Sequence, residues 1–231
     1  MAGDYNEYYS LWANIVMWLV VHTPKTAGTS LRWALEKYFG KSNIIRDYGP
    51  HSKVTGDVVR EHLYSGDESK GPETLVTEIS GENRKILIGH FPLQRYSGFF
   101  ETQNIIAFVR DPLVRMCSEY LHRVKNKSFT GSFLDFLQRP AYQNFQSRFL
   151  DGVSEDTFIG ITEKYPESLQ HINRIAHWAL SARKKNVGRR GGGQKFAENL
   201  SVHELDLFYK MNADDVELYQ FATRRFAALE N

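Results

Sequence analysis

The chain has 231 residues with 29 basic and 27 acidic side chains, and its formal net charge of +2 argues against nucleic-acid binding through bulk electrostatics. Any anion site must therefore be local. With 42% hydrophobic residues and no linker-like stretch dividing it, the chain is long enough for one sizeable core, and we expect a single domain spanning residues 1–231.

The first predicted elements are a strand and a helix joined by a short turn. Residues 14–21 (NIVMWLVV) are rich in β-branched and aromatic side chains, which predicts a buried strand. The apolar positions after the turn have the spacing of one helix face: Leu31, Ala34, Leu35 and Tyr38. The first N–H groups of a helix have no partner inside it and lie at the positive end of its dipole, so the turn predicts an anion site.

The turn itself has the sequence T-P-K-T-A-G-T-S-L over residues 23–31. Lys25 adds a mobile positive charge, and hydroxyl donors come from Thr26, Thr29 and Ser30. In the nucleoside triphosphate P-loop, G-x-x-x-x-G-K-[ST], the lysine follows the second glycine, whereas Lys25 precedes the only glycine of this turn. The turn is therefore either a different phosphate site or an ordinary strand-to-helix connection with a Ser or Thr N-cap.

A second apolar run, residues 85–88 (KILI), ends in Gly89-His90 and predicts another strand. A histidine titrates near neutral pH, so His90 is suited to take a proton from an attacking hydroxyl group. For any one of the eight histidines in the chain, a structural or surface role is the alternative. The position of His90 at the end of a predicted strand favours the catalytic interpretation.

A third apolar run, residues 104–109 (NIIAFV), is followed by Arg110-Asp111-Pro112 and then by a helical pattern. Pro112 suits the first turn of that helix, where its missing N–H would have no partner. Arg110 therefore follows a predicted strand directly, and Ser118 lies two turns into the helix. An arginine can bind a phosphate with its planar fork of donors, although Arg110 taken alone can equally cap a sheet edge.

Ligands of open α/β sheets bind outside the carboxyl ends of the strands. Lys25, His90 and Arg110 each lie just beyond a predicted strand. We therefore expect these three side chains to converge on one crevice.

The last third of the chain contains a strongly basic segment. Residues 183–195 hold six basic residues and four glycines, which predicts a mobile basic loop or a solvated polar linker. Two helical patterns follow, over residues 202–211 and 214–228, and their apolar faces predict that they cover the core.

Three of these segments resemble parts of the sulfotransferases that use 3′-phosphoadenosine 5′-phosphosulfate (PAPS), in particular the carbohydrate-type, or family 2, enzymes. P-K-T-A-G-T-S-L resembles their 5′-phosphosulfate loop, I-A-F-V-R-D-P-L-V-R-M-C-S-E-Y their 3′-phosphate segment, and G-H-F-P-L-x-R-Y the segment that supplies the catalytic base. Residues 144–148 and 160–163 resemble the N-x-Q-[ST]-R and G-[IVL]-T-E segments of bacterial members. These segments occur in family order, and the resemblance spans residues 15–227.

The resemblance implies an α/β fold, with a central parallel sheet flanked by helices and a P-loop-like nucleotide-binding topology. It implies transfer of the sulfuryl group of PAPS to an acceptor hydroxyl, preferably on a carbohydrate, without a metal ion. His90 would be the general base, and Lys25 would stabilise the charge that develops on the leaving phosphate. The sequence contains neither a clustered His/Cys/Asp ligand spacing nor a magnesium-holding P-loop hydroxyl.

The resemblance also implies which residues bind the nucleotide. The 5′-phosphate would be held, chiefly through backbone N–H groups, by Lys25, Thr26, Ala27, Gly28, Thr29 and Ser30. The 3′-phosphate would be held by Arg110 and Ser118, and the basic segment would close on the nucleotide through Arg189, Arg190 and Lys195. Apart from the resemblance, four aromatic residues follow His90 closely along the chain, and we expect them to line the acceptor pocket: Phe91, Tyr96, Phe99 and Phe100.

Residues 42–82 show little periodicity and are rich in acidic, Gly and His residues. Because variable specificity commonly lies in loops over a rigid scaffold, this stretch is either an acceptor-facing insertion or a solvated connector. The sequence does not specify the acceptor or the oligomeric state.

Two other functions are compatible with the sequence. A P-loop kinase or nucleotide hydrolase would use ATP and magnesium, which the absence of a G-K-[ST] triplet after the turn disfavours. A non-catalytic nucleotide-binding module would keep the fold without the chemistry, which the presence of both Lys25 and His90 disfavours.

The cysteine content and the targeting signals of the sequence bear on the cellular compartment of the protein. Cys117 is the only cysteine and lies on the apolar side of a predicted helix, so we expect it in the core, with no intrachain disulfide and a reducing environment. The apolar run at residues 15–21 is too short to cross a bilayer, and the N-terminus lacks the basic region of a signal peptide. We therefore expect a cytoplasmic protein with a small-molecule or glycan acceptor and no nucleic-acid partner.

Overall fold

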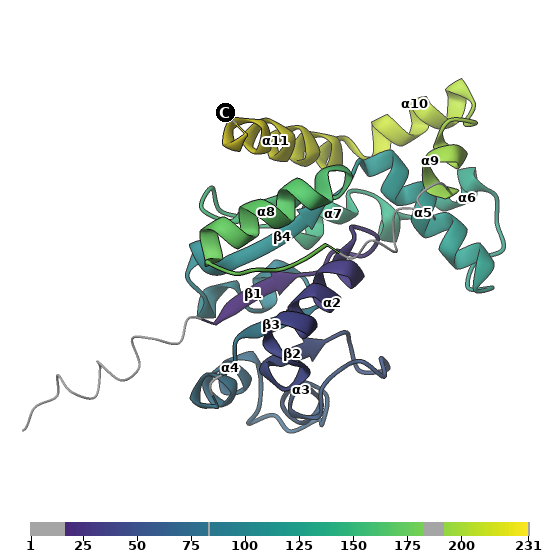
Figure 1. Cartoon of the computed structure of the whole chain (residues 1–231). Coiled ribbons are helices and arrows are strands. Elements are labelled where there is room, and N and C mark those ends of the chain that lie inside the picture. The colour runs from purple at the N-terminus through teal and green to yellow at the C-terminus, as the bar shows by residue number, and fades with distance from the viewer. Residues whose placement is uncertain (1–16, 83, 183–191, 231) are drawn as a thin grey trace, which may run out of the picture.

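The computed structural model describes residues 17–82, 84–182 and 192–230. Within these residues, five strands form one parallel sheet in the order β2-β3-β1-β4-β5 (Figure 1). The strands are β1 (Trp18–Val21), β2 (Ile44–Asp47), β3 (Ile86–Gly89), β4 (Ile105–Val109) and β5 (Phe158–Ile161). The apolar runs of the sequence predict β1, β3 and β4, and the structure confirms all three.

Every residue of β1, β3, β4 and β5 is buried. A parallel sheet covered on both faces needs such continuous apolar strands, because neither face is left to water. β1 lies between β3 and β4, and Val21 pairs in register with Gly89 and with Ala107. The chain therefore leaves the carboxyl ends of these three strands at one edge of the sheet, as the sequence predicts.

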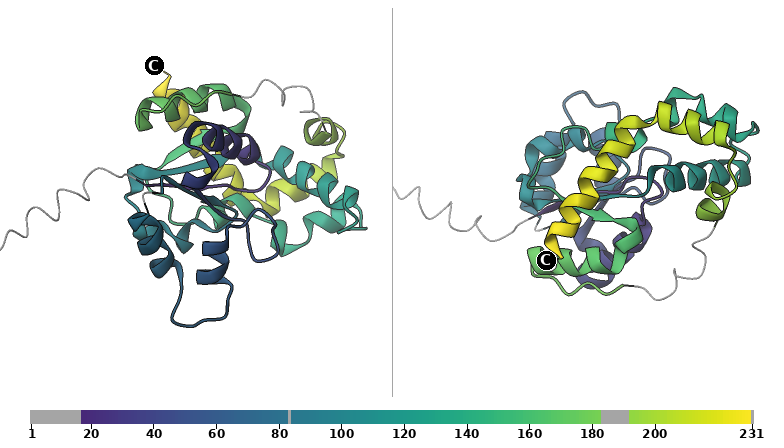
Figure 2. Two further views of the ribbon diagram at one scale, coloured as in Figure 1. Left: turned by 60° about the horizontal axis from the view of Figure 1, so that its bottom comes forward. Right: turned by 90° about the horizontal axis from the view of Figure 1, so that it is seen from above.

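Helices flank this sheet, so the predicted α/β architecture is confirmed. They are α2 (Gly28–Phe39), α3 (Asp57–Leu63), α4 (Pro72–Gly81), α5 (Pro112–Lys125), α6 (Phe133–Leu137), α7 (Phe145–Phe149), α8 (Tyr165–Ala176), α9 (Gly192–Ala197), α10 (Val202–Met211) and α11 (Ala213–Leu229). Figures 1 and 2 show α2 and α8 over one face of the sheet and α4 over the other. The group formed by α5, α6, α9 and α10 lies beyond the carboxyl ends of the strands (Figure 1).

Two clusters of buried apolar side chains hold these layers together. The larger cluster surrounds the sheet, and the smaller one joins α5, α6 and α10. Cys117 belongs to the smaller cluster and is fully buried, and burial raises the pKa of its thiol to about 12. The predicted core position of this cysteine is therefore confirmed.

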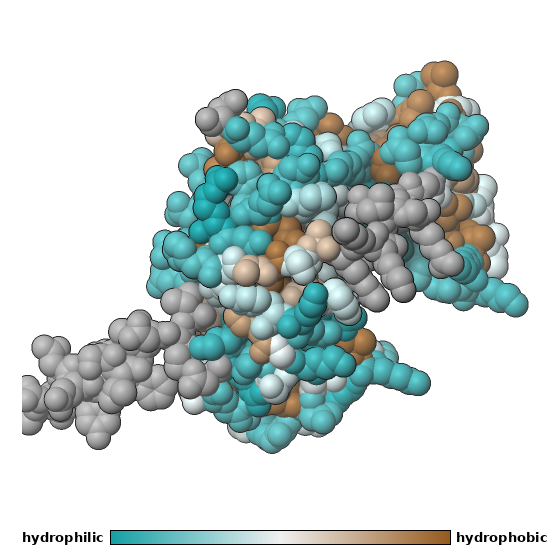
Figure 3. All heavy atoms as spheres, viewed as in Figure 1, coloured by the Kyte–Doolittle hydropathy of each residue, from teal (hydrophilic) through white to brown (hydrophobic). Residues whose placement is uncertain are grey.

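The face seen in Figure 3 is mainly hydrophilic, with hydrophobic side chains gathered over α10, where Val202 is 75% exposed. None of the helices in the described ranges is both long and apolar enough to cross a membrane.

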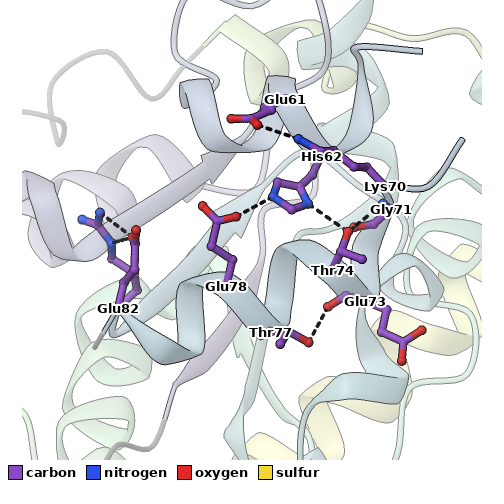
Figure 4. Close-up of polar contacts among 10 residues, drawn as sticks. Glu61, His62, Lys70, Gly71, Glu73, Thr74, Thr77, Glu78 and Glu82 are labelled. Carbon is purple, nitrogen blue, oxygen red and sulfur yellow. Dashed lines mark hydrogen bonds and ion pairs between the residues drawn. The ribbon is translucent and has the colours of Figure 1, made fainter. Parts of the chain in front are cut away.

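The stretch 42–82 is not an irregular insertion or connector, because it contains β2, α3 and α4. His62 of α3 is buried and joins the two helices: its Nδ1 lies 2.9 Å from the Thr74 hydroxyl and its Nε2 lies 2.8 Å from Glu78 Oε2 (Figure 4). The short elements of this stretch give weak periodicity, which explains why the sequence pattern misses them. The alternative of a solvated connector is therefore wrong, whereas the acceptor-facing role of this stretch stays a prediction.

Candidate active site

The connection from β1 to α2 contains two left-handed residues, Lys25 (φ 72°) and Ala27 (φ 64°). A residue with a Cβ pays about 1–2 kcal/mol for this conformation, and such strain is found preferentially at functional sites. Thr26 lies between them, fully buried, and its hydroxyl donates to the Thr23 carbonyl over 2.7 Å. The turn is thus held by its own hydrogen bonds.

The N-terminus of α2 presents unpaired donors. Within the described residues, the N–H groups of Gly28 and Thr29 have no hydrogen-bond partner, whereas the Ser30 N–H donates to the Ala27 carbonyl over 2.8 Å. The N-cap residue is Ala27, and no side chain caps the helix. The alternative prediction, an ordinary strand-to-helix connection with a Ser or Thr N-cap, is therefore wrong. The free N–H groups at the positive end of the helix favour an anion.

Gly28 is required by the packing of this turn. A Cβ on Gly28 would lie 1.8 Å from Cδ2 and 2.2 Å from Nε2 of His22, which follows β1 directly. The His22 ring therefore lies against the first residue of α2. The sequence patterns do not single out His22, although its place between the strand and Thr23-Pro24 is a usable signal.

His90 follows β3 and is tied to the end of β2. Its N–H donates to the Asp47 carbonyl over 2.8 Å. A Cβ on Gly89 would lie 1.6 Å from that same oxygen, so only glycine allows the two strand ends to approach so closely. This close approach fixes the backbone of His90.

The Asp47 carboxylate is fully buried below this contact and is saturated with donors. It accepts hydrogen bonds from Tyr64 Oη (2.7 Å), Tyr96 Oη (2.8 Å) and Arg95 Nη1 (2.9 Å). Buried charges persist in proteins when they are paired in this way. Arg95 and Tyr96 of the G-H-F-P-L-x-R-Y segment thus support the position of His90 through Asp47.

This network corrects the expected acceptor pocket. Phe91 and Tyr96 are fully buried, with their ring centroids 4.6 Å apart, so they belong to the core. Phe100 packs against the same core, and Phe99 is 43% exposed. The prediction that these aromatic residues line one pocket is wrong for Phe91 and Tyr96, because both side chains pack in the core beyond the end of β3.

The first of two cavities lies at the carboxyl ends of the strands and has a volume of about 490 Å³. Its lining consists of His22, Pro24, Lys25, Ala27, Gly28, Thr29, His90, Glu119, His122, Arg123 and Ser128. The expected convergence is therefore confirmed for Lys25 and His90. The α5 residues of this lining were missed, although Glu119, His122 and Arg123 have the i, i+3, i+4 spacing of one helix face.

In this cavity, the pKa values of His90 and Lys25 are both lowered, which favours the neutral form of each side chain. His90 is exposed at the cavity, yet protein surrounds its ring closely enough that burial lowers its pKa to about 4, against an opposing effect of Glu119. Burial also lowers the pKa of Lys25, again opposed by Glu119. At pH 7 the imidazole of His90 is therefore uncharged and able to accept a proton.

The second cavity, about 370 Å³, adjoins the first at the turn, since Ala27 lines both. Its lining consists of Ala27, Ser30, Arg110, Val114, Thr162, Glu163 and Gln194. Arg110 Nη1 donates to the Lys25 carbonyl over 3.2 Å. The structure thus brings Arg110 to the turn but separates it from His90, so two adjacent cavities replace the single predicted crevice.

Two further motif residues position Arg110. Gln146 is fully buried and bonds both backbone groups of Arg110, accepting from its N–H and donating to its carbonyl over 2.9 Å each. Glu163 Oε1 lies 3.7 Å from Arg110 Nε and accepts from the Asp111 N–H over 3.3 Å. Burial raises the pKa of Glu163. The N-x-Q-S-R and G-I-T-E segments are therefore the supports of this arginine.

Ser118 of α5 is half-buried beside α9, where a Cβ on Gly193 would lie 3.1 Å from its Cβ. It lies one helical turn beyond Val114, which lines the second cavity, and it lines neither of the two cavities itself. The predicted nucleotide ligands Arg189 and Arg190 lie outside the described residues. From residue 192 the basic segment is helical, so the expected loop over residues 183–195 is wrong for its last four positions.

No three His, Cys, Asp or Glu side chains gather as metal ligands in the part of the chain that the structure describes.

Comparison with known proteins gives structural neighbours only. No protein-family model and no curated protein sequence matches the chain. Solved structures with a similar fold include a sulfotransferase from Alicyclobacillus acidocaldarius, with 13% identity, a TM-score of 0.45, and coverage of 89% of this chain and 98% of that one.

Two further neighbours are structures of retinol dehydratase. One is in complex with androsterone and the inactive cofactor PAP, with 14% identity, a TM-score of 0.34, and coverage of 87% of this chain and 71% of that one. The other is in complex with retinol and PAP, with 14% identity, a TM-score of 0.33, and coverage of 92% and 74%.

Proposed function

We propose that the chain is a PAPS-dependent sulfotransferase that acts on a hydroxyl group of a carbohydrate-type acceptor. One observation carries this proposal: the turn after β1 separates a cavity that holds Lys25 and His90 from a cavity that holds Arg110. A nucleotide with a 5′-phosphosulfate and a separate 3′-phosphate needs two adjacent anion sites, and a site for the acceptor beside one of them.

The residues present fit such a nucleotide. The unpaired N–H groups of Gly28 and Thr29, together with the backbone of Lys25 and Ala27, would hold the 5′-phosphate, whereas the Thr26 N–H already donates to the Thr23 carbonyl over 3.3 Å. Ser30, which the sequence assigns to the 5′-phosphate, lines the second cavity together with Arg110, so we place both at the 3′-phosphate instead. We assign Ser118, Arg189 and Arg190 to the same phosphate from the sequence resemblance alone.

When bound, PAPS supplies the sulfuryl group that is transferred. His90, neutral at pH 7, would accept the proton of the acceptor hydroxyl. Lys25 would stabilise the negative charge that grows on the leaving phosphate, and the fixed N–H groups at the start of α2 would do so without reorganisation. As in phosphoryl transfer, positioning and charge neutralisation would supply most of the catalysis.

The first cavity supports a polar acceptor. Beyond Lys25 and His90, its wall on the α5 side presents a carboxylate, an imidazole, a guanidinium and a hydroxyl group, from Glu119, His122, Arg123 and Ser128. These groups can donate and accept hydrogen bonds to several hydroxyls at once. A polyhydroxylated acceptor fits this wall better than an apolar one.

The turn argues against a magnesium-dependent kinase. In a P-loop, the hydroxyl residue after the lysine holds magnesium. Thr26 follows Lys25, but its hydroxyl donates to the Thr23 carbonyl and is buried.

Calorimetric titration with 3′-phosphoadenosine 5′-phosphate (PAP), beside ATP with magnesium, tests the proposal. We expect PAP to bind more tightly than ATP. Arg110→Ala should weaken PAP binding about 10- to 100-fold, the equivalent of about 1.5–3 kcal/mol for hydrogen bonds to a charged group. Arg174→Ala, on the exposed surface of α8, is the matched control and should change nothing.

A preference for magnesium-ATP would overturn the proposal in favour of a kinase. Tight PAP binding without turnover of PAPS on any hydroxyl compound would instead indicate a nucleotide-binding module.

A further inference from the structure

His22 is a second histidine in the first cavity. It lies between the proposed phosphate site at Gly28 and the proposed general base, His90. On one side the face of its ring, around Cγ, Cδ2 and Nε2, lies against Gly28, whose N–H is an unpaired donor at the start of α2. On the other side its ring contacts His90 edge to face, with centroids 4.3 Å apart. A group that passes from a phosphate at Gly28 to an acceptor at His90 must therefore pass beside His22.

The place of His22 is fixed by its surroundings. Its N–H donates to the Gly89 carbonyl over 2.9 Å, which ties it to the end of β3. The residue is only 6% exposed, and that exposure faces the cavity, whose lining includes it. Burial lowers the pKa of His22 well below its usual value, and His90 and Arg32 lower it further. The ring is therefore neutral and carries one N–H.

Tyr48 decides which nitrogen carries that proton. The Tyr48 hydroxyl lies 2.9 Å from His22 Nδ1 and has no other hydrogen-bond partner among the described residues. Burial raises the pKa of this hydroxyl, so it keeps its hydrogen at neutral pH. The hydrogen is satisfied when it is donated to Nδ1, and this places the imidazole proton on Nε2.

The other tautomer is disfavoured when an anion is bound. With the proton on Nδ1, the lone pair of Nε2 would face the cavity, and it would repel a negatively charged oxygen held at Gly28. With the proton on Nε2, the Nε2–H group donates a hydrogen bond to that oxygen. Tyr48 and an anion in the cavity therefore favour the same state of His22.

We propose that His22 is a catalytic residue that donates a hydrogen bond from Nε2 to an oxygen of the transferring sulfuryl group, and that Tyr48 is the positioning residue that sets this tautomer. The inference rests on the proposed sulfotransferase function. The acceptor oxygen forms a bond to sulfur while the bond from sulfur to the phosphate oxygen breaks, and that electron pair leaves with PAP. The proton of the acceptor goes to His90, whereas His22 keeps its own proton throughout.

The two histidines would thus have different tasks in the same transfer, His90 at the acceptor hydroxyl and His22 at the sulfuryl group. His90 accepts a proton, and His22 holds the sulfuryl group in line between the attacking and leaving oxygens. PAP lacks the sulfuryl group, so a ligand pair that differs only in that group separates the role of His22 from nucleotide binding in general.

The test compares PAP and PAPS on His22→Leu, His22→Gln and the wild type, with His203→Leu on exposed α10 as the control. PAP affinity is measured by calorimetry, and transfer to water is followed by sulfate release from PAPS, which needs no identified acceptor. We expect His22→Leu to slow sulfate release about 10²-fold, as the loss of one preorganised donor does, with PAP affinity changed by less than about threefold. His22→Gln, which keeps an N–H in reach, should restore part of the rate.

A second readout needs no turnover. Long-range ¹⁵N–¹H spectra of the labelled full chain report the tautomer of each histidine, and we expect His22 to be protonated at Nε2 in the wild type with PAP bound. Tyr48→Phe, which cannot donate to Nδ1, should shift His22 toward the Nδ1 tautomer and slow sulfate release. If His22→Leu does not fold, the spectra of the wild type and Tyr48→Phe still decide the assignment.

The outcomes separate the two proposals. Failure of the wild type to bind PAP would remove the sulfotransferase function and this inference with it. PAP binding and sulfate release that His22→Leu leaves unchanged, or a wild-type His22 protonated at Nδ1, would overturn the role of His22 alone.

Discussion

The side-chain amide of Gln146 bonds both backbone polar groups of Arg110, with its Oε1 accepting from the N–H and its Nε2 donating to the carbonyl, each over 2.9 Å. Gln146 comes from the short helix α7, and its side chain is fully buried. This is the geometry that one strand uses to pair with another. The residue after β4 is therefore held as rigidly as a strand residue, which aims the Arg110 side chain at the turn after β1.

Gln146→Ala should therefore affect stability and nucleotide binding together. The substitution removes the two hydrogen bonds that Gln146 makes to the backbone of Arg110, and each is worth about 0.5–1.5 kcal/mol. Urea unfolding should show that loss, and calorimetry should show weaker PAP binding because Arg110 is no longer fixed. Gln220→Ala, on exposed α11, is the control. Unchanged PAP affinity in a destabilised Gln146→Ala would show that Arg110 does not need this support.

The contact between Gly28 and His22 predicts an unusually costly glycine substitution. In Gly28→Ala the new Cβ would lie 1.8 Å from His22 Cδ2, so the ring or the helix must move. We expect a destabilisation of about 1–3 kcal/mol from overpacking and PAP binding about tenfold weaker. Gly81→Ala is the matched control, because its Cβ meets nothing within 4 Å.

A double-variant cycle checks the cause of that cost. Adding His22→Ala to Gly28→Ala removes the clash, so the two free-energy changes should not add. Additive values would show that Gly28 is required for another reason, such as its own backbone conformation.

The low pKa of His90 predicts a pH dependence of stability. The folded pKa of His90, about 4, lies below the value of 6.5 that a histidine has when it is free in water. Between these pH values the unfolded chain binds the proton that folded His90 does not, so stability falls as the pH falls from 6.5 to 4. His90→Gln should remove part of that dependence, as measured by the urea midpoint across this window. His22 contributes in the same direction, so the comparison with the wild type isolates His90.

Nucleotide binding should reverse part of this shift. A bound polyanion near Lys25 favours the charged imidazole, so PAP should raise the pKa of His90. Histidine resonances followed by NMR titration with and without PAP measure this directly. A pKa that stays near 4, or falls, would place the anion away from His90 and weaken its assignment as the base.

The sequence predicts those parts of the fold in which local pattern and tertiary environment agree. β1, β3 and β4 are continuous apolar runs, and a strand covered on both faces needs just that composition. β2 (IIRD) escapes this pattern because it ends in Asp47, whose burial depends on donors 17–49 residues away along the chain. No local window contains that information.

The candidate site likewise has residues that the sequence predicts and features that it does not predict. Lys25, His90 and Arg110 are predictable because each lies just beyond a strand at the same sheet edge. The separation into two cavities is not predictable, because it depends on the course of the turn at Ala27, which lines both cavities and has a left-handed conformation that no sequence pattern indicates. Motif residues with no predicted role, such as Gln146, prove to be supports, which only the three-dimensional contacts reveal.

Substitution of Glu163 should strengthen PAP binding, whereas the substitutions of Gln146 and Gly28 should weaken it. Its Oε1 lies 3.7 Å from Arg110 Nε, and its side chain is 39% exposed at the second cavity, where it would compete with a phosphate for the guanidinium. Glu163→Gln removes the charge but keeps an oxygen for the Asp111 N–H. We expect PAP to bind about 2- to 5-fold more tightly, the value of one partly exposed ion pair.

Glu217→Gln, on the exposed side of α11, controls for the change in net charge and should leave PAP binding unchanged. Salt separates the competing effects, because an added phosphate contact makes binding more sensitive to ionic strength. Glu163→Gln should therefore bind PAP more tightly at low salt and lose that advantage as salt is added. Weaker binding at every salt concentration would mean that Glu163 positions Arg110 for the phosphate, and that its charge is part of the site.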